Sequence, residues 1–336
     1  MRVIDTLIIG GGQAGLSAAQ AMRGVGIVPV IVEKSHSPTG SWPHYYDSLR
    51  LVTPAKHNGL PDAEFPGDPD RRPLRDEVVN YLLGYAAGLD VDIRTNRAVT
   101  SVARESDVFV TSLSDGSTLA SHTVVAATGC FGSPYWPQLP GIETFPGRLL
   151  HSSQYREPSV FSGCRVLVVG GGNSAIEIAA EAASTAASVT VASRAPLRFT
   201  KPEATLLWPR SGSRVRDHGG YADVLAQGEF TRRPMFSGIG GDVVHWQQGQ
   251  PQQFDVIVMA TGYRPHLDYL SGLNVLNERG FPKHRAGMST TENGLAFLGT
   301  DGRRGRAETS MRRVGRDARF LARRLVRLAK SSVLTR

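Results

Sequence analysis

The chain has 336 residues, of which 40% are hydrophobic, so it is long enough for two domains with cores of their own. Its formal net charge of +8 comes from one segment, because residues 303–336 hold twelve Lys and Arg residues against two acidic ones and leave the remainder at −2. This distribution excludes a surface-wide basic face and disfavours nucleic acid as a partner.

The N-terminal segment predicts a strand, a glycine turn and a helix. Residues 7–9 form an apolar run typical of a buried parallel strand. Gly10, Gly12 and Gly15 follow at the spacing that opens a dinucleotide-binding helix. The first glycine allows the tight turn, the second lets a pyrophosphate approach, and the third lets the helix pack closely on the strand.

The next strand favours a dinucleotide site over an unrelated glycine-rich turn. Residues 28–32 are apolar and lead directly into Glu33. An acidic side chain at this place accepts hydrogen bonds from an adenosine ribose. Strand, turn, helix and acid therefore occur in the order that a dinucleotide requires.

A long irregular stretch follows. Residues 38–46 are rich in turn formers and aromatic side chains, and residues 49–69 continue in the same style. The first loop is either a wall against a flat ring system or ordinary loop packing, and spacing alone leaves both open. Long irregular stretches inside a compact domain are often functional.

Regular elements resume at residue 75. Residues 75–87 have apolar side chains at helical spacing and predict a helix. Residues 99–102 and 108–113, with a turn at residues 115–116, predict a small antiparallel sheet.

A buried strand at residues 123–126 ends in the small residues 127–129 (Ala-Thr-Gly). Small side chains at a strand end permit close approach of a backbone or a cofactor. Residues 132–141 then have the proline and glycine content of a linker, and we expect a domain boundary near residue 156.

The pattern then starts again. Residues 165–169 form a second apolar strand, and Gly170, Gly172 and Ala175 follow at the same spacing. Alanine at the third position still lets helix and strand pack closely. Residues 189–192 supply the next strand of this second copy.

The residues after that strand predict a different nucleotide. Ser193 and Arg194 stand where the first copy has Glu33. An acid would repel a phosphate, whereas an arginine binds one in a bidentate geometry. We therefore expect NADPH at the second turn, with Arg198 as a weaker candidate for the same phosphate.

The segments up to residue 301 are less informative. Residues 200–250 are irregular, and their large apolar side chains are expected in a core. Residues 254–262 repeat the strand that ends in Ala-Thr-Gly and close the second nucleotide domain. Residues 295–298 form a last strand that leads to Asp301, which either reaches the ribityl chain of a flavin or is a solvated turn residue.

The basic C-terminal segment predicts a helix with one apolar face. Apolar residues recur there at near-helical spacing, with arginines between them: Val314, Ala318, Leu321, Leu325 and Leu328. This stripe favours docking on a core over a nucleic-acid or membrane-surface arm, because it needs to be covered. Attraction of an anionic cofactor is a further alternative.

Cysteine use and apolar runs suggest a compartment. Cys130 and Cys164 lie 34 residues apart and imply no disulfide framework. No apolar run reaches the length of a spanning helix or a signal core. We expect a cytoplasmic protein with no membrane partner. No His or Cys pair has ligand spacing, so we expect no metal site.

Two nucleotide-binding repeats with paired Ala-Thr-Gly strands resemble the flavoproteins that use FAD and NAD(P)H and are built from two such domains. The resemblance covers nearly the whole chain and implies an α/β fold with two Rossmann-like domains of three-layer ββα type. Residues 1–156 and 264–336 would form the FAD domain, and residues 157–263 would form an NADPH domain inserted in it. The missing Cys-x-x-Cys pair disfavours a thioredoxin-reductase-like reaction.

One segment narrows the family. Phe145, Gly147, His151 and Tyr155 are similar to the Phe-x-Gly-x-x-x-His-x-x-x-Tyr fingerprint of the group B flavin-containing monooxygenases. That group includes N-hydroxylating enzymes, plant indole-pyruvate monooxygenases and, with a different final aromatic residue, Baeyer-Villiger enzymes. Residues 40–42 (Gly-Ser-Trp) resemble its FAD-proximal Gly-Gly-x-Trp motif, with serine in place of a glycine.

Three further segments, residues 40–61, 232–236 and 314–318, resemble short bacterial members found with arsenic-resistance genes. There is also a departure from the family. Many flavin-containing monooxygenases have an active-site Asn in a Thr-Asn pair, whereas this chain has Thr53 followed by Pro54. The residue that would help to hold the oxygenated flavin is absent, which puts the efficiency of coupled oxygenation in question.

The resemblance implies that NADPH transfers hydride to FAD and that reduced flavin and O2 form a C4a-(hydro)peroxide, which gives one oxygen atom to a small substrate at nitrogen, sulfur, carbon or arsenic. His151 and Tyr155, as the residues implied at the catalytic hinge, would order that hinge and the bound NADP. The residues implied in FAD binding are Gly10, Gly12, Gln13, Ala14, Gly15, Glu33, Lys34, Gly40, Ser41, Trp42, Ala127, Thr128, Gly129 and Asp301. The residues implied in NADPH binding are Gly170, Gly172, Asn173, Ser174, Ala175, Ser193, Arg194, Ala260, Thr261 and Gly262.

Two other functions stay open. An NADPH-dependent flavin oxidase or electron-transfer reductase would pass electrons to O2 or to a partner; Pro54 favours it and the fingerprint disfavours it. A catalytically silent nucleotide sensor would not turn over NADPH at all. The oligomeric state is open as well, with a homodimer as one alternative.

Overall fold

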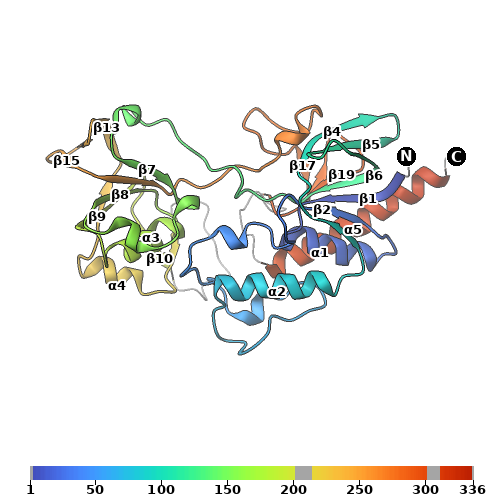
Figure 1. Cartoon of the computed structure of the whole chain (residues 1–336), viewed down its shortest axis with the longest axis horizontal. Helices are drawn as coiled ribbons and strands as arrows, with labels where there is room; N and C mark the ends of the chain where they lie inside the picture. Colours follow the sequence, from blue (N-terminus) through green and yellow to red (C-terminus); the bar gives the residue numbers. More distant parts are fainter. Residues whose placement is uncertain (1–2, 201–213, 301–310, 335–336) are drawn as a thin grey trace. The chain divides into compact units, whose positions relative to one another are not determined.

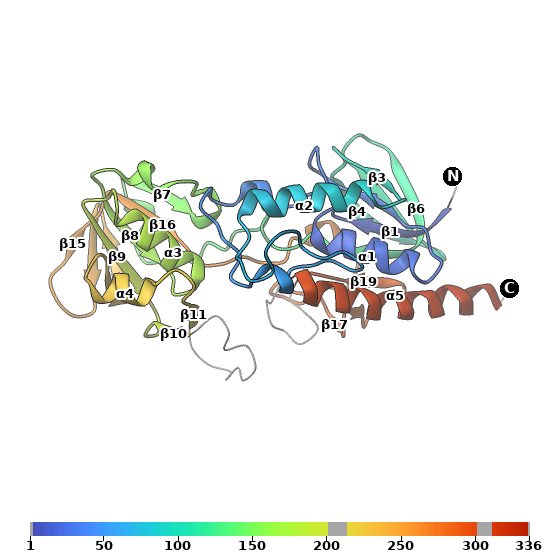
Figure 2. The same ribbon diagram turned by 90° about the horizontal axis from the view of Figure 1, so that it is seen from below.

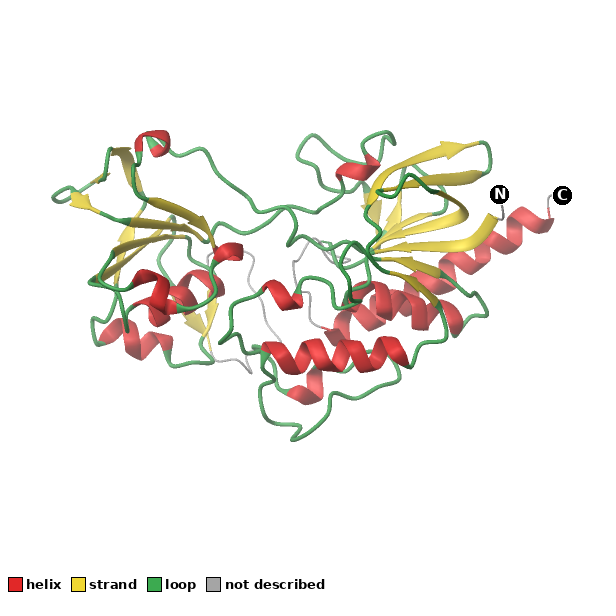
Figure 3. Cartoon of the chain, viewed as in Figure 1, coloured by secondary structure: helices red, strands yellow, loops and turns green. Residues whose placement is uncertain are grey.

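The computed structural model describes residues 3–200, 214–300 and 311–334. The chain folds into two compact units, each with its own helices and strands (Figures 1 and 3). The first unit comprises Met1–Pro43, Thr53–Ser133 and Arg264–Arg336, and the second comprises His44–Val52 and Pro134–Tyr263. The expected α/β fold, in which one unit interrupts the other, is confirmed.

The first unit is built on a sheet of strand order β17-β18-β19-β6-β1-β2-β3, in which the five strands from β19 to β3 run parallel. Two of its inner strands, β1 and β2, are buried from Leu7 to Ile9 and from Val30 to Val32, as expected for parallel strands covered on both faces. The strands are β1 (Val3–Ile9), β2 (Val30–Val32), β3 (Asp92–Arg94), β4 (Val99–Glu105), β5 (Val108–Leu113), β6 (Thr118–Ala126), β17 (His284–Arg285), β18 (Met288–Ser289) and β19 (Leu295–Phe297).

Different layers cover the two faces of this sheet. Leu7, Ile9 and their neighbours pack against the antiparallel pair β4–β5 and the segment around Leu270. Helix α1 (Gln13–Arg23) covers the other face, and α5 (Met311–Leu334) lies along α1 (Figure 2). The predicted helix at residues 75–87 is confirmed as α2 (Arg75–Ala87). Short 3-10 turns lie at Trp42–His44, Ala55–His57 and Asp268–Leu270.

Helix α5 confirms the predicted C-terminal helix. Its buried side chains include Val314, Ala318, Leu321 and Leu325, which are the described members of the predicted apolar stripe. Five arginines on the same helix are exposed: Arg316, Arg319, Arg323, Arg324 and Arg327. Arg319 forms a 2.8 Å ion pair with Asp62. The helix is therefore docked along one face and solvated along the other.

The second unit has a parallel sheet of order β12-β9-β8-β16-β7. Alternate residues of β8 face different layers: Val166 and Val168 pack with helix α3, whereas Leu167 and Val169 pack against the antiparallel strands β13 and β14. The elements are β7 (Arg148–His151), β8 (Arg165–Val169), α3 (Asn173–Ala182), β9 (Ser188–Ser193), β10 (Arg198–Thr200), β11 (Arg214–Arg216), α4 (Tyr221–Ala226), β12 (Thr231–Pro234), β13 (Phe236–Gly240), β14 (Val243–Trp246), β15 (Gln252–Gln253) and β16 (Val256–Met259), with 3-10 turns at Ile142–Thr144, Ser152–Gln154 and Pro158–Phe161.

The units divide at other residues than the sequence suggested. The second unit begins at Pro134, whereas we expected a boundary near residue 156. Strand β7 (Arg148–His151) pairs in parallel with β16, which ties this stretch to the second sheet. A short segment, His44–Val52, also belongs to the second unit, although the sequence on either side of it belongs to the first.

The expectation of irregular structure at residues 200–250 is wrong for its described part. Residues 214–250 form β11, α4, β12, β13 and β14. These elements are three to six residues long, which is too short for a periodic pattern to develop. Phe236 and Trp246 lie in a hydrophobic core, as predicted for the large apolar residues of this stretch. Residues 201–213, and Trp208 among them, lie outside the described part of the chain.

Among the described residues, none of the helices combines the length and the apolar character needed to cross a lipid bilayer.

Candidate functional site

The glycine turn of the first unit is too tight for any side chain. Gly10 has φ +104°, and a Cβ on it would lie 2.7 Å from the carbonyl oxygen of Ala127 at the end of β6. A Cβ on Gly15 would lie 1.8 Å from the carbonyl oxygen of Gly10. Ala14 is buried beside these glycines. The turn therefore joins β1, β6 and α1 at one point, at the carboxyl ends of the strands.

Glu33 braces this turn from the end of β2. Its Oε2 accepts a hydrogen bond from the amide of Gly11 at 2.6 Å, and its Oε1 accepts one from the amide of Ser35 at 2.8 Å. The residue is only 4% exposed. Because each carboxylate oxygen accepts more than one hydrogen bond, Glu33 retains acceptor capacity for ribose hydroxyls. The two backbone contacts could not be foreseen from the spacing.

The loop at residues 38–46 reaches the same turn. Gly40 has φ +59°, and a Cβ on it would lie 2.9 Å from the Cα of Gly12. The indole Nε1 of Trp42 donates a hydrogen bond to Oε1 of Gln13 in the first turn of α1. Ser41 lies between them. The structure thus brings together residues that the sequence predicted separately, from the glycine turn and from the loop.

A third strand end contributes residues 127–129. The hydroxyl of Thr128 donates to the carbonyl oxygen of His266 at 2.6 Å, and Gly129 has φ +64°. Lys34 lies near His266, because a Cβ on Gly132 would be 3.3 Å from both Lys34 Nζ and His266 Cγ. Burial lowers the pKa of His266, and the positive charge of Lys34 lowers it further, while Asp268 raises it. His266 is therefore held neutral beside a cation.

These residues fit the diphosphate of a flavin dinucleotide. The N-cap of α1 is Gly12, which forms no side-chain cap, and the first turn of α1 contains no acid. No acidic side chain of the first turn of α1 therefore competes for the helix N-terminal amides. A Cβ at Gly12 would project against Gly40, so glycine is needed where the loop and the turn meet. Asp301, predicted near the ribityl chain, lies outside the described residues.

The segment that departs from the family pattern has its own asparagine. Asn58 is 2% exposed, and its Nδ2 donates to the carbonyl oxygens of Thr53 at 2.9 Å and Pro54 at 2.8 Å. Its Oδ1 accepts from the Thr53 hydroxyl at 2.9 Å. Both N–H donors of the amide are thus used within the loop that it closes. Sequence reasoning missed Asn58, because its role depends on the fold of a loop without periodicity.

The second glycine turn repeats the first in the second unit. A Cβ on Gly170 would lie 2.3 Å from the carbonyl oxygen of Ala260, at the end of β16. Gly172 is the N-cap of α3, and among the described residues a Cβ on it would meet no atom within 4 Å beyond its chain neighbours. Ala175 is 1% exposed against the sheet. Thr261, between Ala260 and Gly262, donates its hydroxyl to the carbonyl oxygen of Tyr135 at 2.5 Å.

Asn173, at the start of α3, makes contacts inside the protein. Its Nδ2 lies 3.1 Å from the carbonyl oxygen of Arg216 and 3.3 Å from Oε1 of Glu177, and its Oδ1 accepts from the Arg216 amide at 3.3 Å. The side chain of Asn173 therefore fastens β11 to the helix, while Ser174 beside it is half-buried.

Glu177 forms a buried polar cluster that sequence reasoning missed. Its carboxylate accepts a hydrogen bond from the hydroxyl of Tyr46 and lies 3.7 Å from Nε2 of His218. Burial raises the pKa of the Glu177 carboxyl above its ordinary value. Because Tyr46 belongs to the segment His44–Val52, this cluster attaches that segment to α3.

Ser193 is the last residue of β9 and Arg194 follows it, and a third residue, Arg232, contacts Ser193. The guanidinium of Arg232, from β12, donates to Oγ of Ser193 at 3.0 Å through Nε and to the carbonyl oxygen of Ser193 at 3.1 Å through Nη2. Arg194 is exposed. Arg198 is exposed on β10, which pairs with β11 in a separate two-stranded sheet. No local pattern identifies Arg232, because its position follows from the register of β12 on β9.

His151 of the fingerprint has a defined tautomer. Its Nδ1 accepts a hydrogen bond from the amide of Ser153 at 3.1 Å, so the ring proton is on Nε2, which donates to the carbonyl oxygen of Gly262 at 3.1 Å. The residue is fully buried, and its ring lies 5.1 Å from that of Tyr263. His151 thus ties the end of β7 to the second Ala-Thr-Gly segment.

This tautomer gives a pH dependence of stability. Burial lowers the pKa of His151, although the hydrogen bond to Gly262 opposes the shift. The unfolded chain gains the proton near pH 6.5, whereas the folded chain gains it only at lower pH. Between these two pH values the unfolded state binds more protons, so the free energy of unfolding falls as the pH falls.

We therefore expect wild-type protein to lose more stability than His151→Gln between pH 7.5 and about pH 5. Glutamine keeps one donor and one acceptor but has no proton to gain. Chemical denaturation of both proteins across this range measures the difference, in which the effect of His266 cancels. Parallel pH profiles for the two proteins would contradict the assignment.

Tyr155, the other fingerprint residue, belongs to a core. It is 1% exposed and stacks on Phe161, with ring centroids 5.4 Å apart. Its hydroxyl donates to Oε2 of Glu181 at 2.6 Å. Burial and then this carboxylate raise its pKa well above the ordinary range. The phenol therefore stays protonated and fixes the segment after β7 to α3.

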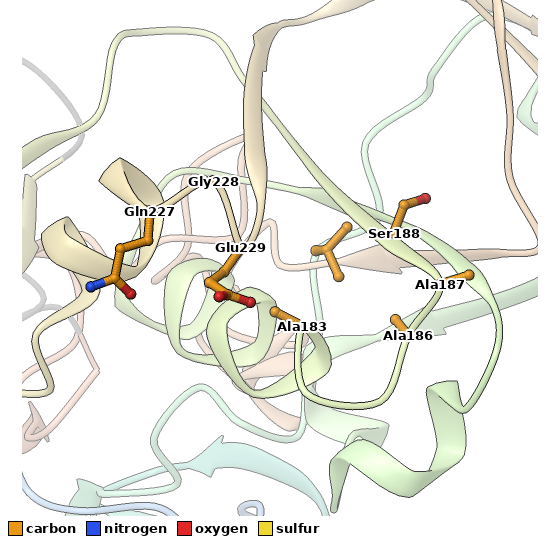
Figure 4. A pocket seen from close by; sticks show the side chains of 8 residues that line it. Ala183, Ala186, Ala187, Ser188, Gln227, Gly228 and Glu229 are labelled. Carbon is orange, nitrogen blue, oxygen red and sulfur yellow. The ribbon is translucent and has the colours of Figure 1, made fainter.

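A pocket of about 250 Å³ lies elsewhere in the second unit. Figure 4 shows Gln227 and Glu229 on one side of it and Ser188 with the neighbouring alanines on the other. Ser188 is the first residue of β9, so the pocket lies at the amino end of that strand. Ligands of open α/β sheets bind at the carboxyl ends of the strands. The residues predicted to bind nucleotides lie at the carboxyl ends of the strands, not at this pocket. The pocket therefore belongs to no site that the sequence predicted.

Comparisons with known proteins agree with this geometry. The family described as pyridine nucleotide-disulphide oxidoreductase matches residues 7–299. An uncharacterized CzcO-like oxidoreductase of Geobacillus kaustophilus is 30% identical over 95% of this chain and 97% of its own. The structure of a flavin-containing monooxygenase from Stenotrophomonas maltophilia matches with a TM-score of 0.91 and 30% identity, covering 97% of this chain and 99% of that one.

A plant relative extends the comparison. Indole-3-pyruvate monooxygenase YUCCA1 of Oryza sativa is 35% identical across 52% of this chain and 44% of its own length. The family and the solved monooxygenase support use of a flavin together with a nicotinamide cofactor. The chain belongs to the pyridine nucleotide-disulphide oxidoreductase family and, within it, to the flavin-dependent monooxygenases.

Proposed function

We propose that the first unit binds FAD and the second binds NADPH. The observation that carries this is the pair of glycine turns with opposite charges beyond them. Glu33 follows the first turn and is suited to ribose hydroxyls, whereas Arg194 follows the second and is suited to a 2′-phosphate. The residues Gly12, Gln13, Gly40 and Thr128 would hold FAD beside Glu33.

The bound flavin would supply hydride acceptance from NADPH and activation of dioxygen. The residues of the chain bind and orient. Glu33 keeps the first turn closed through the amides of Gly11 and Ser35. His151 and Tyr155 act as positioning residues, because one is a buried neutral imidazole bonded to Gly262 and the other is a buried phenol bonded to Glu181.

The proposed reaction is the NADPH- and O2-dependent oxygenation of a small substrate at a nitrogen, sulfur, carbon or arsenic atom. The fingerprint at residues 145–155 supports it, as do relatives named as monooxygenases. A second candidate is an NADPH-dependent flavin oxidase or reductase that releases peroxide or passes electrons to a partner. The loop at Thr53 and Pro54 favours this candidate, because both N–H donors of the nearby Asn58 amide are already bonded within the loop.

Labelled oxygen separates the two candidates. Purified holoenzyme is given NADPH, 18O2 and, in turn, a thioether, a tertiary amine, a cyclic ketone and a trivalent arsenical. We expect at least one product to carry a single 18O atom, with a matching drop in peroxide released per NADPH consumed. Peroxide equal to NADPH consumed, with every substrate of this set, would favour the oxidase. No NADPH consumption at all would favour the silent sensor.

Arg194→Ala tests the choice of nucleotide. The exposed guanidinium would contact the group that distinguishes NADPH from NADH, so its loss should raise KM for NADPH about tenfold or more. KM for NADH should change little. Steady-state kinetics with both nucleotides measure this ratio, and equal changes in the two KM values would refute the assignment. Arg279→Gln, which removes an exposed arginine of the first unit, controls for the change in net charge.

A further inference from the structure

Arg232 is held against the end of β9 by the architecture of the second sheet. Strand β12 pairs in parallel with β9, with Arg232 opposite Val191 and Pro234 opposite Ser193. The guanidinium then reaches Ser193, where Nε bonds to the hydroxyl oxygen and Nη2 to the carbonyl oxygen. That carbonyl belongs to the peptide that joins Ser193 to Arg194. The guanidinium of Arg232 is therefore bonded to the residue that directly precedes Arg194.

The guanidinium of Arg232 has hydrogen-bond donors that the described residues do not use. It carries five N–H groups, of which the two bonds to Ser193 use two. Within residues 3–200 and 214–300, it forms no ion pair and no further hydrogen bond, and Arg194 forms none at all with its side chain. The charges of Arg232 and Arg194 thus have no carboxylate partner among the described residues, and a bound anion would pair with them.

Ser193 is a positioning residue at this strand end. Its hydroxyl donates to the carbonyl oxygen of Ala195 at 2.8 Å, so its proton is already used. The same oxygen accepts from Arg232 Nε. Ser193 is 2% exposed. It therefore has no donor for a phosphate and instead fixes the guanidinium of Arg232 to the turn that carries Arg194.

We propose that Arg232 is a second ligand of the 2′-phosphate of NADPH, acting beside Arg194, with Ser193 holding it in place. This inference rests on the proposed function, because it assigns a residue within the NADPH site. It also replaces Arg198 as the second arginine, since Arg198 lies on a different small sheet and is not tied to Ser193. Arg232 then contributes to the preference for NADPH over NADH.

Binding of 2′,5′-ADP and 5′-AMP to the full-length holoenzyme tests the inference without turnover. The two probes differ only by the 2′-phosphate, and calorimetry gives the ratio of their affinities. We expect Arg232→Gln to weaken 2′,5′-ADP binding by about tenfold to a hundredfold, the effect of losing hydrogen bonds to a charged group, and to change 5′-AMP binding less than twofold. Arg232→Lys should fall between, because lysine keeps the charge but cannot bond Ser193 twice.

Controls distinguish loss of 2′-phosphate binding from misfolding and from the change in net charge. Arg279→Gln should bind both probes as the wild type does, and a thermal melt of each variant reports folding. If Arg232→Gln does not fold, Arg232→Lys decides, because a loss of 2′,5′-ADP affinity with normal 5′-AMP binding supports the inference.

Three results contradict a proposal. Discrimination lost in Arg194→Ala but intact in both Arg232 variants overturns the inference and leaves the proposed function standing. If Arg198→Gln loses discrimination as fully as Arg194→Ala while Arg232→Gln keeps it, then Arg198 binds the 2′-phosphate. That result also overturns the inference about Arg232. A wild type that binds the two probes equally overturns the NADPH assignment itself.

Discussion

Gly15→Ala is expected to yield protein without bound flavin and with a destabilised first unit. The new Cβ would lie 1.8 Å from the carbonyl oxygen of Gly10, and a backbone oxygen cannot move aside as a flexible side chain can. Overpacking of this kind costs about 1–3 kcal/mol or more, whereas the better helix propensity of alanine returns only about 1 kcal/mol. The clash therefore outweighs the propensity, and α1 has to move away from the turn.

Gly84→Ala is the matched control. Gly84 also lies within a helix of the first unit, but beyond its own helix backbone a Cβ on it would meet nothing within 4 Å in the described part of the chain. This variant should be as stable as the wild type or up to about 1 kcal/mol more stable, with full flavin content. The absorbance of the bound flavin per protein and the thermal midpoint measure both effects. Normal flavin content in Gly15→Ala would show that α1 need not pack this closely for the cofactor to bind.

The sequence was sufficient for the parts of the site that are encoded locally. Glycine spacing identified both turns, because only glycine tolerates the contact at Gly10 and the close packing at Gly15. The apolar runs that became β1 and β8 identified the two sheets, because strands buried on both faces leave no polar alternation. The stripe on α5 was visible for a similar reason, since a single docked face imposes a helical period.

Residues whose roles depend on strand register or loop closure were not visible. Arg232 reaches Ser193 only because β12 pairs with β9, and Asn58 bonds Pro54 only because an irregular loop closes on itself. Glu177 looked like an ordinary helix residue, yet it is buried and accepts a hydrogen bond from Tyr46 of a distant segment. In each case the partner is set by tertiary contacts that leave no period in the sequence.

Gly172→Ala is expected to impair NADPH binding while leaving the fold almost intact. The backbone of Gly172 is extended, with φ −95° and ψ −176°, so alanine adopts it without strain. A Cβ there meets no atom within 4 Å among the described residues beyond its chain neighbours, so a bound ligand is the group that we expect it to contact. If the pyrophosphate of NADPH lies at this turn, losing even one of its charge-assisted hydrogen bonds costs about 1.5–3 kcal/mol, and KM for NADPH rises about tenfold to a hundredfold.

Gly238→Ala makes the comparison specific to the turn. Gly238 lies on β13 of the same unit, and a Cβ on it would make an ordinary contact 3.5 Å from the carbonyl oxygen of Pro140. Its KM for NADPH should match the wild type. Flavin content and thermal midpoint should be close to wild type in both variants, because neither adds a clash. The contrast with Gly15→Ala is the physical point: the protein itself requires glycine at position 15 of the first turn, whereas at position 172 of the second turn only the ligand requires it. An unchanged KM for NADPH in Gly172→Ala would therefore show that the pyrophosphate does not bind at this turn, whatever the spacing of its glycines.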